Sequence, residues 1–177
     1  MSVRRRIALV LGAALASHAA ALVLVPRAIF TSVVGRPFEG RGTNELGHRA
    51  LPKPGMRAWG PSPDLLYSKC VYDVSAGPVR VITPVPGGYW SMSVYAENTD
   101  LVAVVSDREL PEHRLDAVLA FPGQATPAGV RVIEVPTARG AAFFRTLVED
   151  PADEAALDAL RREGSCAPAP LRGAPSP

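Results

Sequence analysis

The chain has 177 residues, of which 47% are hydrophobic, so its length and composition suit one domain with a buried core plus accessory segments. Three of its 19 basic residues are Arg4 to Arg6, and the remaining 16 nearly balance the 17 acidic residues. A near-neutral body without clustered Lys and Arg lacks the positive surface that holds a phosphate backbone, so we expect no nucleic-acid partner.

The first segment predicts a membrane-spanning helix. Residues 1–6 form a basic tail, and the helix is expected over residues 7–26, because Ile7 to Val25 contains no Asp, Glu, Lys or Arg. At about 1.5 Å per residue such a helix is roughly 28 Å long, close to the hydrocarbon thickness of a bilayer. The basic tail adjoins the apolar run. We therefore expect a single pass of the inner (cytoplasmic) membrane, with the N-terminus inside and the C-terminal domain outside, in the periplasm.

A cleaved signal peptide is the alternative, and it would leave a secreted β-domain protein. Ala14-Leu15-Ala16 and Ala19-Ala20-Ala21 both fit a small-x-small cleavage pattern behind a basic region. We favour the uncleaved anchor, because the apolar run is longer than the usual core of about 7 to 15 residues in a signal peptide. His18 lies near the middle of this span. A titratable group at that depth is a candidate functional residue, and a neutral imidazole bonded to a local carbonyl is the plainer alternative.

The next segment, residues 27–64, is dense in Gly and Pro, which break both helices and strands. We expect a stalk that becomes an irregular wrap over the domain, with His48 as a solvated loop residue. A β-rich domain is then predicted over residues 65–166. Alternating or apolar segments separated by turn residues indicate seven strands, over residues 67–74, 79–83, 89–95, 101–105, 116–120, 130–135 and 141–148.

The spacing of these segments predicts a mainly β fold, an antiparallel sandwich or jelly-roll-like domain, in which the first two strands form a hairpin. In the strand over residues 89–95, Trp90, Met92 and Val94 are expected to face the core. Its other face could line a ligand pocket or form an ordinary outer sheet surface. The side chains on that face are Tyr89, Ser91, Ser93 and Tyr95.

One helix closes the domain. Asp150 is the predicted N-cap, Pro151 suits the first helical position, and Gly164 is a plausible residue just past the end. Ala155, Leu157 and Leu160 are expected to pack on the sheet. The tail, residues 167–177, is rich in Pro and Ala and is predicted to be disordered.

The two cysteines stand near the two ends of the predicted domain. Cys70 lies in the first strand and Cys166 follows the helix, and an even pair in a translocated domain suggests a disulfide. Two unrelated buried thiols are the alternative.

No phosphate-binding loop, paired-Cys metal pattern, His-Glu-x-x-His motif or nucleophile elbow occurs in the sequence, so no metal site or cofactor is predicted. Whether the protein is an enzyme stays open, and the empty motif search favours a non-enzymatic protein. Asp73, Asn98 and Asp100 could approach one another and bind calcium, although turn-forming side chains explain them more simply. A hydrolase or a small-ligand carrier is a further alternative, and a hydrolase would need Ser91, Tyr95, Asp73 and His113 in one cleft. The candidate ligand-facing residues are Tyr72, Asp73, Tyr89, Ser91, Ser93, Tyr95, Asn98 and Asp100.

Two strand motifs carry a resemblance to a known family. The pattern begins with Tyr67 and the segment Cys70-Val71-Tyr72-Asp73-Val74-Ser75-Ala76-Gly77-Pro78. It continues through Tyr89-Trp90-Ser91-Met92-Ser93-Val94-Tyr95 to Asn98 and Asp100. It resembles the domain of unknown function 1254 family, and looks most like its short branch of predicted integral membrane proteins.

That resemblance implies one N-terminal helix, a single β-rich domain and, as a possible partner, a companion protein that carries the domain of unknown function 1214. It implies no activity, cofactor or catalytic residue. The most direct expectation is therefore a membrane-anchored envelope protein whose outer domain binds or scaffolds an unknown ligand.

Overall fold

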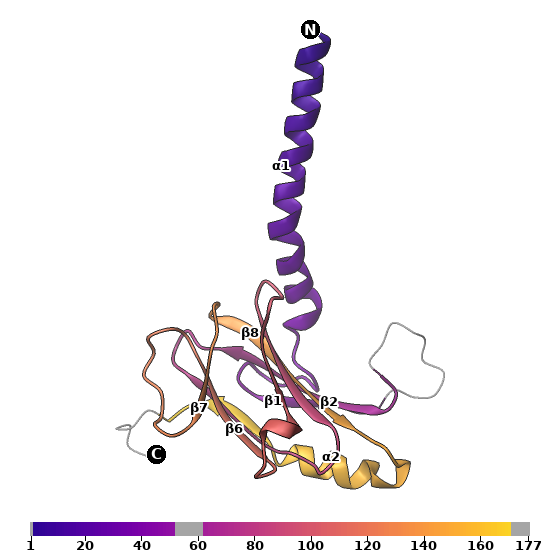
Figure 1. Cartoon of the computed structure of the whole chain (residues 1–177), viewed down its shortest axis with the longest axis vertical. Coiled ribbons are helices and arrows are strands. Elements are labelled where there is room, and N and C mark those ends of the chain that lie inside the picture. Colours follow the sequence, from indigo (N-terminus) through magenta and orange to yellow (C-terminus); the bar gives the residue numbers. More distant parts are fainter. Residues whose placement is uncertain (1, 52–61, 171–177) are drawn as a thin grey trace.

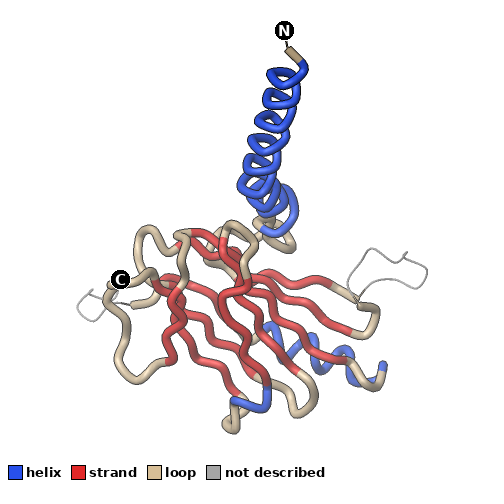
Figure 2. Tube along the Cα trace, turned by 45° about the horizontal axis from the view of Figure 1, so that its top comes forward, coloured by secondary structure: helices blue, strands red, loops and turns tan. Residues whose placement is uncertain are grey.

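The computed structural model describes residues 2–51 and 62–170. A long helix, α1 (Val3–Ile29), continues into a π-helical turn, η1 (Phe30–Val34), and leads into a β domain. The helix projects from one end of the domain, and a short helix, α2 (Glu154–Arg162), lies at the far end (Figure 1). Figure 2 shows the strands gathered below α1.

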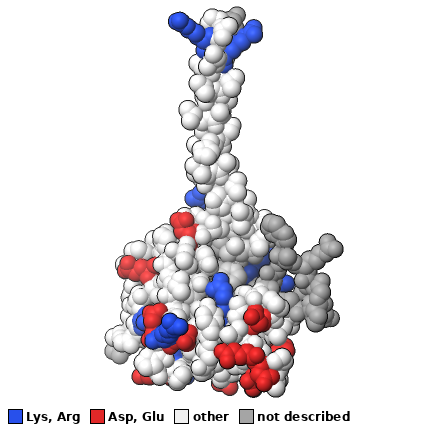
Figure 3. Space-filling view, turned by 45° about the vertical axis from the view of Figure 1, so that its right-hand side comes forward, with Lys and Arg blue, Asp and Glu red and all other residues white. Residues whose placement is uncertain are grey.

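The N-terminal helix is longer than the predicted residues 7–26. The sequence places its end at Pro26, but the helix runs through this proline, and helical structure reaches Val34. On either side of the proline, side chains bond helix carbonyls: Arg27 Nη1 donates to the Val23 carbonyl at 3.0 Å, and Thr31 Oγ1 donates to the Arg27 carbonyl at 3.1 Å. None of the most apolar stretch of Val3–Val34 is buried, and its mean hydropathy is 2.2. Figure 3 shows it as a band without charged side chains below the basic tip. A membrane anchor and a signal sequence both meet these criteria.

The β domain is a sandwich of two sheets, which confirms the predicted fold class. The five-stranded sheet has the order β1 (Leu46–Arg49), β2 (Leu65–Asp73), β8 (Arg139–Leu147), β4 (Trp90–Ala96), β5 (Leu101–Ser106). The four-stranded sheet has the order β7 (Arg131–Glu134), β6 (Arg114–Ala120), β3 (Val79–Pro84), β9 (Ser165–Pro168). Short 3-10 turns follow β5 at η2 (Asp107–Glu109) and precede α2 at η3 (Pro151–Asp153).

The predicted hairpin between the first two strands is wrong. β2 pairs with β1 and β8, and β3 belongs to the other sheet. The reason is that both edges of β2 are occupied, so the turn at Ser75 to Pro78 carries the chain across the sandwich. The hairpin of β4 and β5 does form, and every pair is antiparallel except β6 with β7, which run parallel.

Two short strands were missed. β1 lies inside the segment predicted as an irregular wrap, and β9 reaches into the predicted disordered tail. Each has only four residues and gains its order from pairing with a longer strand, β2 or β3. The predicted irregular wrap at residues 52–61 and the predicted disordered tail at residues 171–177 lie outside the described residues.

The core lies between the sheets and confirms the predicted orientation of β4. Trp90, Met92 and Val94 are each at most 1% exposed. The predicted disulfide between Cys70 and Cys166 is present, and it joins β2 of one sheet to β9 of the other. It thus ties the two layers together across the core, which both cysteines enter.

Asp150 is an N-cap as predicted, because its Oδ1 accepts a hydrogen bond from the Ala152 N–H at 2.9 Å. It caps the 3-10 turn η3, and α2 itself begins at Glu154. Its packing differs from the prediction. Ala155 is exposed, Leu157 and Leu160 are half-buried, and the buried residue is Arg161. Gly164 is not in the left-handed conformation of a typical helix-ending glycine. It leaves space instead, since a Cβ there would lie 2.9 Å from Leu46 Cδ2.

Candidate ligand site at the base of the N-terminal helix

The end of the N-terminal helix is built into the domain. Phe30, the first residue of η1, is only 1% exposed. Gly35 makes room for its ring, because a Cβ at this position would lie 2.8 Å from Phe30 Cε1. Lys69 of β2 donates from Nζ to the Val34 carbonyl at 3.2 Å, so a positive charge caps the helix where its dipole is negative. The junction is thus a packed contact.

Lys69 is buried among aromatic rings on the outer face of the five-stranded sheet. Its Nζ lies 4.3 Å from the centroid of the Phe38 ring and 5.2 Å from that of Phe143, distances typical of cation-π contacts. Burial, helped by the positive charge of Arg49, lowers the pKa of Lys69 from 10.5 to about 8. At neutral pH the side chain therefore remains largely protonated and holds the helix end.

The polar face of β4 is neither open nor solvated at its centre. Ser91 and Ser93 are 5% and 6% exposed, whereas Tyr95 is half-buried and Tyr89 is 47% exposed. Tyr89 Oη lies 3.1 Å from Ser91 Oγ, and Arg145 Nη1 of β8 donates to Ser93 Oγ at 2.9 Å. The two serines therefore hold neighbouring side chains in place. Of the four predicted residues on this face, Tyr95 reaches a pocket.

That pocket, of about 270 Å³, lies where the helix meets the outer sheet face. The helix contributes Ile29 and Val34, the turn after β4 contributes Thr99, and the sheet contributes the remaining walls. Two of these walls are aromatic and meet edge to face, since the ring centroids of Tyr95 and Phe143 lie 5.9 Å apart. We call it the junction pocket, lined by Ile29, Val34, Tyr95, Thr99, Phe143 and Arg145.

Arg145 gives the junction pocket its charge. Within residues 2–51 and 62–170, no carboxylate forms an ion pair with this guanidinium. The bond to Ser93 uses one terminal nitrogen and fixes the direction of the side chain. The pocket therefore combines one oriented positive charge with aromatic and aliphatic walls, a combination suited to an amphipathic anion.

The other predicted ligand-facing residues have structural roles. Tyr72 is fully buried, its Oη donates to the Tyr95 carbonyl at 2.9 Å, and burial raises its pKa. Asp73 Oδ1 accepts bonds from Ser75 N and Oγ, and these bonds lower the pKa of Asp73. Asn98 Nδ2 donates to Asp100 Oδ2 at 2.6 Å within the β4–β5 turn.

Asp73, Asn98 and Asp100 are thus turn-forming residues, and the described part of the chain holds no cluster of metal-ligating side chains. His18 lies on the exposed surface of α1.

The residues required for the hydrolase alternative do not converge. Ser91 and Tyr95 lie on one face of β4, four residues or about 13 Å apart. Asp73 bonds its own turn, and the carbonyl of His113 pairs with Val85 N near the four-stranded sheet. These positions form no pair of nucleophile and base.

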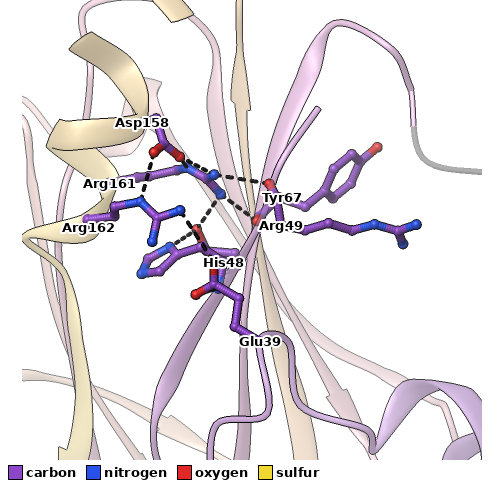
Figure 4. A network of polar contacts seen from close by, with 8 residues as sticks. Glu39, His48, Arg49, Tyr67, Asp158, Arg161 and Arg162 are labelled. Carbon is purple, nitrogen blue, oxygen red and sulfur yellow. Dashed lines mark hydrogen bonds and ion pairs between the residues drawn. The ribbon is translucent and has the colours of Figure 1, made fainter. Parts of the chain in front are cut away.

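A second polar cluster pins α2 to the edge of the five-stranded sheet (Figure 4). Arg161 is 5% exposed and donates to the carbonyls of Tyr67 at 2.6 Å and Arg49 at 3.0 Å. Its Nε also donates to Asp158 Oδ1 at 2.8 Å. A shallow pocket of about 310 Å³ beside it is lined by Asp158 and Arg162, which already pair with each other at 2.7 Å. We therefore conclude that this cluster stabilises the fold and is not a ligand site.

His48 belongs to the same cluster, and its prediction as a solvated loop residue is wrong. The side chain is 4% exposed, and its Nδ1 lies 2.9 Å from Ser68 Oγ. Burial, followed by the positive charges of Arg161 and Arg162, lowers the pKa of His48 from 6.5 to about 4. The imidazole is therefore neutral at physiological pH. The error followed from the missed strand β1, which carries His48 into the sheet.

Sequence reasoning also missed Arg145, Phe143 and Lys69 as site residues. The signal was present, because register places Lys69 opposite Phe143, and Phe143 opposite Ser93. Residues paired in this way share one face of a sheet. Local alternation does not predict that β2 pairs with β8. The sequence therefore did not predict that Lys69, Phe143 and Ser93 lie side by side on three neighbouring strands.

Comparisons with solved structures support the fold. A protein from Vibrio parahaemolyticus matches with a TM-score of 0.63 at 18% identity, over 89% of this chain and 40% of its own. An uncharacterized protein from Burkholderia cenocepacia matches with a TM-score of 0.52 at 15% identity, over 89% of this chain and 42% of its own. This chain thus spans about two fifths of the length of either solved protein. None of the functionally curated proteins matches the sequence.

The family comparison covers the whole sandwich. The family described as "Protein of unknown function (DUF1254)" matches residues 43–168, a range from the loop before β1 to the last residue of β9. The match includes both strand motifs and both cysteines, and it extends over more than half of the chain. The chain therefore belongs to the DUF1254 family.

Proposed function

We propose that the protein is a single-pass membrane-anchored protein of the cell envelope whose outer β domain binds and scaffolds a companion protein. The observation that carries the proposal is the packed junction: the apolar helix enters the domain through buried Phe30 and the Lys69 bond to Val34. A helix that serves only as a removable leader needs no such contacts. The disulfide supports an oxidising compartment, and the basic tail supports an N-terminus on the cytoplasmic side of the inner membrane.

The side of the sandwich formed by β5 and β7 is the proposed companion surface. These strands end their respective sheets, and the ion pair of Arg131 with Glu109 at 3.4 Å links the start of β7 to η2 after β5. Leu101, Val104 and Val132 are exposed here by 55%, 52% and 41%. Unpaired strand edges with apolar side chains favour association.

The greater length of the matched solved chains supports the choice of companion. The matched solved chains are more than twice as long as this one, so their corresponding domain is joined to further polypeptide. We propose that a separate protein with the domain of unknown function 1214 supplies the equivalent contact here.

Two experiments test the proposal. Cell fractionation with intact-mass measurement should find the full-length, disulfide-bonded chain in the inner membrane, and a chain shortened at Ala16 or Ala21 would contradict the anchor. Co-purification from native membranes should recover the companion with the wild type. Val104→Asp should reduce the recovery at least fivefold, because it places a charge in the interface. Ala156→Asp, at an exposed position of α2 near the opposite edge of the five-stranded sheet, should leave it unchanged. Equal recovery with Val104→Asp would exclude this surface.

A further inference from the structure

The junction pocket stands at a defined height on the helix. The uncharged run Ile7 to Val25 is roughly 28 Å long and fills the hydrocarbon layer, after which Arg27 marks the polar boundary. Ile29 lies about 3 Å beyond Arg27 along the helix, and Val34 lies within about 10 Å of it. The head-group layer on each side of a bilayer is about 5 to 8 Å thick. Within the helical wall of the pocket, Ile29 therefore lies at the level of the lipid head groups, and Val34 lies just beyond their outer limit.

The other walls of the junction pocket have the polar and aromatic groups that suit the head-group layer. Arg145 presents a guanidinium without an ion-pair partner among the described residues, and Ser93 holds it in position. Tyr95 and Phe143 provide amphipathic and aromatic surface, which suits the boundary between acyl chains and water. In the β4–β5 turn, Asp100 accepts a hydrogen bond from Asn98, and it forms no ion pair with Arg145 among the described residues.

We propose that the junction pocket binds the head-group phosphate of an anionic phospholipid, with Arg145 paired to the phosphate. The apolar walls formed by Ile29 and Phe143 contact the glycerol and the start of the acyl chains. This inference rests on the proposed anchoring, because the helix sets the height of the pocket. An inorganic phosphate would satisfy Arg145 but would leave the apolar walls in contact with water.

The test uses the full-length protein in detergent micelles, with phosphatidylglycerol and phosphatidylcholine as probes in native mass spectrometry. The wild type should retain phosphatidylglycerol about tenfold better than phosphatidylcholine, the effect of one charge-assisted contact. Arg145→Gln should reduce this preference to nearly one, and Arg145→Lys should retain part of it. Arg139→Gln is the matched control, since Arg139 lies on the same strand and the same face but does not line the pocket. It should leave the preference unchanged.

Each opposite result has a distinct meaning. Equal preference in the wild type and Arg145→Gln would overturn the proposal, and so would an equal loss with Arg139→Gln, which would indicate general surface charge. Displacement of phosphatidylglycerol by millimolar inorganic phosphate would identify a free-phosphate site and would also overturn it. Melting curves with an intact disulfide show whether each variant is folded. If the full-length chain fractionates with membranes but shows no lipid preference, the anchoring stands and only the lipid assignment fails.

Discussion

The structural role of His48 becomes clear only when the strand that contains it, β1, is recognised. In the sequence it stands between Gly47 and Arg49 in a segment rich in turn residues. In the structure it lies within reach of the charges of Arg161 and Arg162, with its ring against Ser68. Its burial in neutral form makes the stability of the protein depend on pH.

We predict that the free energy of unfolding falls as the pH is lowered from about 6.5 to about 4. The imidazole of folded His48 takes up its proton only near pH 4, whereas in the unfolded chain it does so near 6.5. The unfolded state thus binds more protons in this window, so acid favours unfolding. Thermal unfolding in detergent at several pH values measures the effect. His48→Asn keeps a polar partner for Ser68 and should flatten this part of the profile. An unchanged profile would show that other groups cause the acid sensitivity.

Gly140 is the second residue whose role only the packing reveals. A Cβ at this position would lie 2.0 Å from Tyr72 Oη and 2.2 Å from the Tyr95 carbonyl oxygen, so β8 can pass between its neighbours only with glycine. Gly140→Ala should destabilise the protein by about 3 kcal/mol, the upper part of the range for an overpacked core. Gly87→Ala is the control, because a Cβ there meets nothing within 4 Å. Denaturant titration of both variants measures the difference, and equal midpoints would contradict the predicted clash.

Among the elements, α2 departs most from a simple amphipathic helix. Its two leucines are only half-buried, and its attachment depends on Arg161. The Arg161 guanidinium donates to the carbonyl of Arg49, the last residue of β1, and to that of Tyr67, near the start of β2. The guanidinium thus joins three elements that are distant in sequence.

Removal of Arg161 should therefore cost more than the loss of a surface charge. Arg161→Met keeps much of the aliphatic volume but removes the guanidinium from two carbonyls and from Asp158 Oδ1, and we expect a loss of about 3 kcal/mol. Arg162→Ala removes exposed ion pairs to Asp158 and Glu39 and should cost less than about 1 kcal/mol. Chemical denaturation of the two variants checks this ranking. A smaller loss for Arg161→Met than for Arg162→Ala would show that the buried network does not hold the helix.

The elements also show what sequence alone can predict. Alternation in β4 and the turn residues before β5 are local signals that predicted those strands correctly, and the Asp150 cap predicted the 3-10 turn that leads into α2. The strand β1 and the partner of β2 are decided by contacts between residues far apart in the chain, for which local alternation carries no information. For the same reason Tyr95 was named as a pocket residue while Arg145, which completes the pocket, was not.

At the scale of the whole molecule, the disulfide links the first long strand to the last strand of the sandwich. It closes a loop of 96 residues between Cys70 and Cys166 and fastens one sheet to the other. In the chain-entropy model, a loop of about 100 residues corresponds to about 4.7 kcal/mol of stabilisation.

We expect the double substitution Cys70→Ala with Cys166→Ala to lower the unfolding free energy by about 4 kcal/mol. Treatment of the wild type with reductant should have a similar effect, because both remove the same crosslink. Denaturant midpoints measured with and without reductant provide the comparison. A double variant that is as stable as the oxidised wild type would show that the core alone holds the layers together.

The packed junction also limits how the domain moves in the proposed membrane setting. A domain on a flexible stalk samples many heights and tilts, whereas Phe30 and Lys69 fix this one to the helix, so its main free rotation is about the membrane normal. A companion anchored in the same bilayer would then meet the β5 and β7 side at a constant height. Both proteins then diffuse only in the plane of the membrane, and only the rotation of each domain about the membrane normal must match. This restriction raises the effective concentration of the partners without any additional contact.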